Sequence, residues 1–146
     1  MFTYNLQTVL DYRQSIEEQK LTVFSEAERS LQQVKEVLQE IRDQQKALVK
    51  ELKALKDREC RSRDIGLVLS FAEELKKREE QQIEVVRETT AFFEAKRQEL
   101  LEAVKQRKMM EIHKDHQYQE YRSDLISSER RESDDLSIQR YTRREQ

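Results

Sequence analysis

The chain has 146 residues, with no proline, one glycine and one asparagine, and charged side chains at 40% of its positions. Because a compact globular domain of this length needs many turns, which draw on glycine, proline and asparagine, this composition argues against an ordinary globular domain. Basic and acidic residues nearly cancel, 28 against 30, so we expect no nucleic-acid partner.

The most regular apolar pattern begins at Phe24 and predicts a coiled-coil helix. Alternating steps of three and four residues meet an apolar side chain at every position except Gln45, and charged or amide side chains fill most positions between. A stripe this narrow requires a partner helix, because a lone helix would leave it in water. Its positions are Phe24, Ala27, Leu31, Val34, Leu38, Ile41, Gln45, Leu48, Leu52 and Leu55.

The residues before this stripe carry a weaker apolar set in another phase. The set consists of Phe2, Leu6, Val9, Ile16 and Val23, with Arg13 and Lys20 in the two remaining positions. It joins the central stripe through two successive steps of four residues, a stutter that locally unwinds a supercoil. We therefore expect looser helix pairing at this end.

The repeat stops after Leu55, and the stretch that contains Gly66 predicts the only turn, at about residues 58–66. Helix 1 is expected over about 3–57 and helix 2 over about 67–140, folded antiparallel. We predict an all-α, long two-helix antiparallel coiled-coil hairpin, a single domain over 1–146, with a C-terminal helical extension that frays. The expected positions of the second stripe are Val68, Ala72, Leu75, Glu79, Ile83, Val86, Thr90, Phe93, Arg97, Leu100 and Val104.

Catalytic chemistry is not indicated by any motif. His113 and His116 are three residues apart, but without a third ligand motif a solvated pair is the favoured interpretation. The chain has no glycine-rich phosphate loop and no nucleophile motif, so we expect no enzymatic activity, no cofactor and no metal. Cys60 stands alone, and no apolar run indicates a signal peptide or a membrane span, so we expect a cytoplasmic protein without direct membrane insertion.

The start of the second helix is richer in apolar residues than a single partner helix can cover. These residues are Leu67, Leu69, Phe71 and Leu75. They mark either a docking surface or the packing of the turn, and both interpretations stay open.

Short motifs stand at both ends of the chain. Phe2, Tyr4 and Leu6 alternate with polar residues and lead to Val9-Leu10, Arg13 and the acidic pair Glu17-Glu18. Near the other end, Glu132 precedes the acidic pair Asp134-Asp135, and Arg140 follows. Together with the length and the lack of proline, these motifs resemble the FliJ family of flagellar export proteins over the whole chain.

The resemblance implies an antiparallel coiled coil similar to the central stalk of rotary ATPases, in the cytoplasm and held at the inner membrane through the type III export apparatus. The end with both termini would enter the hexameric export ATPase (FliI), a face toward the turn would contact the export gate protein (FlhA), and export chaperones are further expected partners. The expected ATPase contacts are Leu6, Leu10, Arg13, Glu17, Asp134, Asp135 and Arg140. The expected gate contacts are Gln44, Leu48, Phe71, Leu75, Arg78 and Gln82. The alternatives are a stalk protein of an injectisome, which shares this shape, and a passive coiled-coil spacer.

Overall fold

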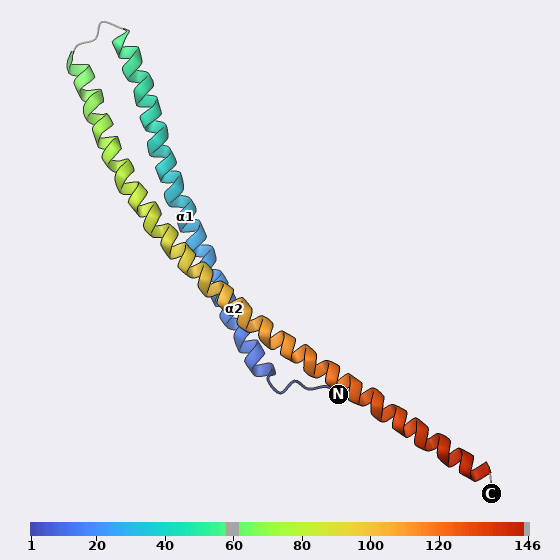
Figure 1. Ribbon diagram of the computed structural model, residues 1–146. Coiled ribbons are helices and arrows are strands. Elements are labelled where there is room, and N and C mark those ends of the chain that lie inside the picture. The colour runs from blue at the N-terminus through green and yellow to red at the C-terminus, as the bar shows by residue number, and fades with distance from the viewer. Residues whose placement is uncertain (58–61, 145–146) are drawn as a thin grey trace. The chain divides into compact units, whose positions relative to one another are not determined.

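Two long α-helices account for most of the computed structural model, which describes residues 1–57 and 62–144 (Figure 1). Helix α1 spans Gln7–Lys56, and helix α2 spans Ser62–Arg144. The two helices pack against each other, and the described residues contain no strand. The prediction of an all-α fold built from a helix pair is therefore confirmed. No helix within the described residues combines the length and the hydropathy that crossing a membrane requires.

The chain packs as two compact units, and each is described by itself. The central unit comprises Gln19–Leu101, and the terminal unit comprises Met1–Glu18 with Glu102–Gln146. The organisation as a single domain stays a prediction.

The expected turn was too long, because helix α2 already begins at Ser62. Residues 62–66 are helical rather than part of a turn, and Gly66 has an ordinary helical backbone with negative φ. A single glycine lowers helix stability by only about 1 kcal/mol relative to alanine. Asp64 in the first turn offsets part of this by placing a negative charge at the positive end of the helix dipole. The other predicted turn residues, 58–61, lie outside the described residues.

The core of the central unit follows the predicted stripe of α1. All ten of its positions are buried or half-buried, with Ala27, Leu31 and Leu38 at 3%, 8% and 9% exposure. Helix α2 runs antiparallel to it: Phe24 packs on Phe93 with ring centroids 5.1 Å apart, whereas Gln45, further along α1, donates to Glu79, earlier in α2. Leu75 of α2 is the described side chain with the most complete burial, at 0% exposure.

The predicted stripe of α2 was wrong at two positions. Ile83 is 44% exposed, and Gln82 takes its place between the helices, where its amide donates to the carbonyl oxygen of Val34 at 2.9 Å. Likewise Arg97 is exposed and Lys96 is half-buried. The inward positions keep the steps of three and four residues, but several of them are polar. A search for apolar side chains therefore selects Ile83 instead of Gln82. A hydrogen-bonded amide can nevertheless occupy a buried position.

The predicted apolar set near the start of α1 is half-buried at Ile16 and Val23 but is wrong at its first helical positions. Leu6 and Val9 are 41% and 39% exposed, whereas Leu10 is 3% exposed and Arg13 and Glu17 are half-buried. From Leu10 the steps of three and four lead through Lys20 directly into the stripe at Phe24, so no stutter is needed. Arg13, Glu17 and Lys20 hold inward positions between Leu10 and Phe24. Because these residues are charged, an apolar pattern alone does not show that they face α2.

Candidate functional site

The first six residues form a segment that folds back onto α2 within the terminal unit. The ring of Phe2 packs on Tyr118 and Tyr121, with centroids 5.4 Å and 5.6 Å away. Tyr4 is 5% exposed, and its hydroxyl oxygen lies 2.9 Å from Nδ1 of His113. This contact explains why α1 begins at Gln7 rather than at about residue 3, since the segment is held by aromatic packing instead of helical hydrogen bonds.

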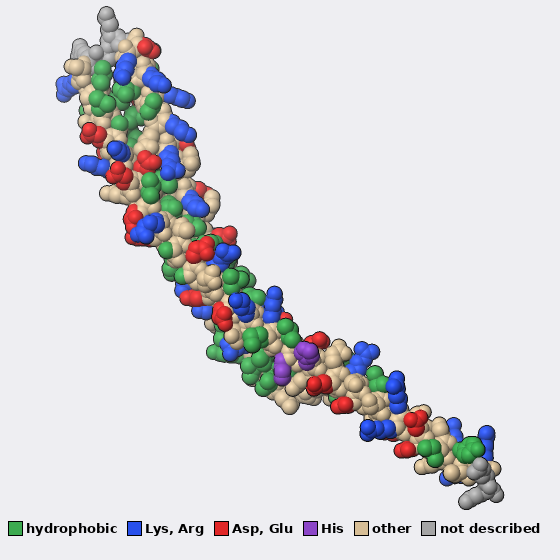
Figure 2. All heavy atoms as spheres, viewed as in Figure 1, with side chains coloured by type: hydrophobic (Ala, Val, Ile, Leu, Met, Phe, Trp, Pro, Cys, Tyr) green, Lys and Arg blue, Asp and Glu red, His purple; other side chains and the backbone are tan. Residues whose placement is uncertain are grey.

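This segment gives His113 a structural partner, although the sequence favoured a solvated histidine pair. The His113 ring lies 5.8 Å from that of Tyr4, and the neighbouring Lys114 donates to Gln7 at 2.8 Å. Figure 2 shows the histidines beside hydrophobic side chains. Within residues 1–57 and 62–144 no group of three or more His, Cys, Asp or Glu side chains is placed to hold a metal ion.

A charged cluster replaces apolar packing further along the terminal unit. Arg107 of α2 binds the carboxylates of Glu17 on α1 and of Glu111 on its own helix. These two carboxylates, Glu111 foremost, raise the pKa of the Arg107 guanidinium above its ordinary value. The side chains of Arg107 and Glu17 are only 22% and 21% exposed, so this pair is part of the helix interface. Glu17, an expected ATPase contact, is thus engaged in holding the helices together.

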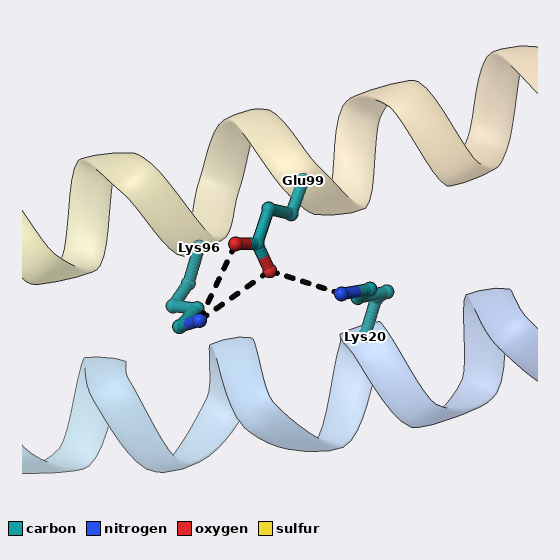
Figure 3. Close-up of polar contacts among 3 residues, drawn as sticks. All are labelled: Lys20, Lys96 and Glu99. Atoms are coloured by element: carbon teal, nitrogen blue, oxygen red, sulfur yellow. Dashed lines mark hydrogen bonds and ion pairs between the residues drawn. The ribbon is translucent and has the colours of Figure 1, made fainter.

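The central unit contains a related cluster at Glu99 (Figure 3). Its carboxylate lies between two ammonium groups, at 3.1 Å from Lys20 of α1 and 3.3 Å from Lys96 of α2. Hydrogen bonds from Lys20 first, and then from Lys96, hold the pKa of Glu99 below its ordinary value of 4.5. The cluster places a charged contact where a coiled coil would ordinarily pack apolar side chains.

Glu99→Gln should therefore reduce the loss of stability in acid. Because the pKa of Glu99 is lowered in the folded state, its contribution to stability is fully present above about pH 4.5 and is lost as the pH falls through the lowered value. Urea melts between pH 7 and pH 3 should show a shallower decline for the variant. The effect is small because the pair is partly solvated. A Glu80→Gln variant, at an exposed position, is the control, and identical pH profiles for wild type and Glu99→Gln would contradict the role.

The expected gate contacts divide into buried and open side chains. Leu75 is fully buried, and Leu48 and Gln82 are half-buried. Gln44, Arg78 and Phe71 are exposed, with Phe71 at 43% and Arg78 paired with Glu74 at 2.5 Å. The prediction of an exposed apolar patch that includes Leu75 is therefore wrong, because this side chain is not accessible to a partner. Leu67 and Leu69 are exposed, at 66% and 49%.

A groove between α1 and α2 in the central unit was not predicted. It has a volume of about 410 Å³, and its apolar lining comes from Leu48, Val49 and Leu52 of α1 and from Val68, Leu69 and Ala72 of α2. The stripe positions among these residues pointed to the interface, but the opening between the helices could not be read from one sequence.

The last part of α2 lies outside the helix pair. All side chains of residues 122–144 are exposed, including Asp134, Asp135 and Arg140, and so are the apolar side chains of Leu125, Leu136 and Tyr141. At the start of the chain Leu6 is exposed, Arg13 is half-buried and Leu10 is buried. The expected ATPase contacts are therefore open at Leu6, Asp134, Asp135 and Arg140, and engaged in the helix interface at Leu10 and Glu17.

The model of the flagellar FliJ protein family matches residues 2–146 of the chain. The chain belongs to the FliJ family. No curated protein and no solved structure matches it. The FliJ family is a non-catalytic component of the flagellar export apparatus, and this FliJ-family protein therefore acts in flagellar protein export. The predicted resemblance of the whole chain to this family is confirmed.

The structure gives the two motifs of this FliJ-family protein different roles. In the first motif, Phe2, Tyr4 and Leu10 are packed against α2, so these residues shape the fold. In the second motif, Asp134, Asp135 and Arg140 are exposed on a helix that nothing in the described chain covers. The second motif therefore contributes nothing to the packing of the described residues.

Proposed function

We propose that this FliJ-family protein is a non-enzymatic coupling factor, the central stalk of the flagellar type III export apparatus. In this proposal the terminal unit enters the hexameric export ATPase, and the central unit contacts the export gate protein. The protein stays in the cytoplasm, held at the inner membrane through these partners, and export chaperones are further partners. The stalk adds no chemistry of its own but helps to couple ATP hydrolysis to substrate entry.

The observation that carries the proposal is the exposed helix of residues 122–144. An isolated helix in water is marginally stable even when its sequence favours helix, so this segment gains most from a surrounding protein surface. Leu125 and Leu136 are eleven residues apart, about three helical turns, and therefore lie on one face. Asp134, Asp135 and Arg140 supply exposed charge of both signs beside them. The wall of a protein pore offers apolar and charged contacts of this kind.

The proposal assigns direct contacts only to open side chains. Toward the ATPase these are Leu6, Asp134, Asp135 and Arg140, while Leu10 and Glu17 position the helices and the half-buried Arg13 stays a candidate contact. Toward the gate they are Gln44, Phe71 and Arg78, while Leu48, Leu75 and Gln82 maintain the helix pair beneath. The alternatives, an injectisome stalk and a passive spacer, use the same helix pair. A passive spacer would leave the ATPase unchanged.

Arg140→Glu should lower stimulation of the export ATPase several-fold, because the reversal replaces a base with an acid on the exposed helix that also carries Asp134 and Asp135. Stimulation of ATP hydrolysis by the purified chain is the measurement, with helix content by circular dichroism alongside. Arg97→Glu, at an exposed position of the central unit, is the matched control and should stimulate like wild type. Arg13→Glu makes the same charge reversal on α1 of the terminal unit and tests whether that helix also takes part in stimulation.

Two outcomes would contradict the proposal. If wild-type protein fails to raise hydrolysis at all, the passive spacer is the better description. If both Arg13→Glu and Arg140→Glu stimulate like wild type, the terminal unit does not face the ATPase.

A further inference from the structure

The groove of the central unit is open to a further apolar side chain. Its two most exposed apolar lining residues are Val49 of α1, at 52%, and Leu69 of α2, at 49%. Val68 and Ala72 are half-buried below them. The volume of about 410 Å³ accommodates several aliphatic side chains, which is what successive apolar positions of a helix present.

One edge of this groove is strongly basic. A neighbouring hollow on α1 shares Gln45, Val49 and Glu79 with the groove and is also lined by Arg42, Lys46, Lys50 and Lys53. Lys and Arg side chains follow this edge of α1 near the connection between the helices (Figure 2). Steps of four, four and three residues keep these basic side chains on neighbouring turns, so they form a stripe along the helix.

Apart from Arg42, which pairs with Glu79, the basic side chains of this stripe have no ion-pair partner among the described residues. Glu79 is occupied by Gln45 and Arg42, whose hydrogen bonds hold its pKa below the ordinary value. Lys46, Lys50 and Lys53, and Lys76 on the α2 side of the groove, have no ion-pair partner among residues 1–57 and 62–144. Four ammonium groups therefore flank an apolar groove. This surface is complementary to an amphipathic helix that has carboxylates on both sides of its apolar face.

This surface shares the half-buried Leu48 with the expected gate contacts but is separate from the exposed ones, Gln44, Phe71 and Arg78. Leu69 and Phe71 are two residues apart, which places their side chains about 200° apart around α2. Phe71, Arg78 and Gln44 do not line the groove, whereas Leu69, Ala72 and Lys76 do. A partner in the groove would leave the face of Phe71 open.

We propose that the groove binds an acidic amphipathic helix of a partner protein, which packs its apolar face on Val49 and Leu69 and its carboxylates on Lys46, Lys50 and Lys53. A helix is favoured over an anionic membrane surface because the apolar residues line a concave groove, which a flat surface cannot fill, and because Glu79 lies within it. The acidic sign of the partner follows from the unpaired lysines at both edges.

The test measures binding of a synthetic 21-residue helical peptide, with leucines at heptad positions a and d and glutamates at e and g, to the full chain by fluorescence anisotropy. Lys46→Glu/Lys50→Glu/Lys53→Glu should weaken binding about tenfold, since each exposed ion pair contributes modestly and three are reversed. Lys77→Glu/Lys105→Glu/Lys108→Glu makes the same change of net charge at other exposed positions and should bind like wild type.

Two further variants separate the apolar contact from the charge. Leu69→Ala should weaken the peptide severalfold while Phe71→Ala does not, because only Leu69 lines the groove. A peptide with lysine in place of every glutamate should not bind. In cells, the groove triple variant should swarm less than the control triple variant, while its stimulation of the export ATPase stays normal.

Several results would overturn the inference. Equal loss of binding in both triple variants would mean that the attraction is only general charge. Phosphatidylglycerol vesicles that bind wild type but not the groove variant, with no peptide binding, would assign the stripe to a membrane surface. A dimer in sedimentation that the groove substitutions dissociate would assign it to a second copy of the chain. Normal swarming of the groove variant would mean that no export partner uses it.

Discussion

Leu75→Ala should lower the free energy of unfolding by about 2–3 kcal/mol, the low end for a leucine truncation, because a two-helix interface is shallower than a full core. Leu75 has 0% exposure in the central unit, and the smaller side chain would leave a cavity between α1 and α2. Urea melts followed by circular dichroism measure the change. Leu67→Ala, at a side chain that is 66% exposed, should shift the free energy by less than about 0.5 kcal/mol.

The result also affects how gate binding is tested. A charge at Leu75 would unfold the central unit, and loss of binding in such a variant would say nothing about a direct contact. Phe71→Asp is the cleaner substitution, because Phe71 is 43% exposed. If Leu75→Ala melts like wild type, the packing described for this helix pair is incorrect at its centre.

Truncation after Tyr121 should abolish stimulation of the export ATPase without lowering the thermal midpoint. The truncated chain keeps Tyr118 and Tyr121, on which Phe2 packs, and every described residue that it loses, 122–144, has an exposed side chain. Ellipticity should fall because a helical segment is lost, while the midpoint of the remaining transition should stay within a few degrees, as expected when no buried contact is removed.

A full-length variant distinguishes the loss of specific contacts from the shortening of the helix. Asp134→Lys/Asp135→Lys keeps the helix and reverses its acidic pair, and it should reduce stimulation nearly as far as the truncation does. A midpoint lowered by about 5 °C or more in the truncated chain would show that residues 122–144 stabilise the fold. Stimulation that survives the truncation would remove the proposed ATPase contact from this segment.

The apolar part of the fold could be predicted from the sequence. The stripe from Phe24 to Leu55 is apolar at all positions but one, so its period alone predicted the buried face of α1. The length of the apolar repeat on each side of the connection also predicted two antiparallel helices. Burial of aliphatic side chains is a local property of the helix, and periodicity detects it.

The polar part of the interface could not be predicted in the same way. Gln82, Glu99 and Arg107 lie between the helices because α1 supplies a hydrogen-bond acceptor or an opposite charge for each of them. A glutamine or arginine in a sequence does not reveal that partner. The folded-back segment of Phe2 and Tyr4 depends in the same way on rings more than 100 positions away, and the pairing of Tyr4 with His113 has a sequence separation of 109.

The exposure of the candidate contact residues could be predicted only in part, while the contacts themselves stay predictions. The end motifs identified the family, and the structure leaves Asp134, Asp135 and Arg140 open. The residues near the turn were chosen for their apolar character, and this character placed Leu75 inside the helix pair. The groove and its basic edge depend on side chains from both helices, so neither helix alone indicated them.

The charged positions between the helices fix the alignment of α1 with α2. Apolar positions are nearly interchangeable, and a purely aliphatic pair can slide by one heptad at little cost. A slide of one heptad in one direction would set Arg107 against Leu10 instead of Glu17. A slide in the other direction would set Glu99 against Ala27 instead of Lys20. Each slide would separate a partly buried charge from its partner on α1. These ion pairs therefore favour one register of the helix pair over its neighbours and oppose sliding of α1 along α2.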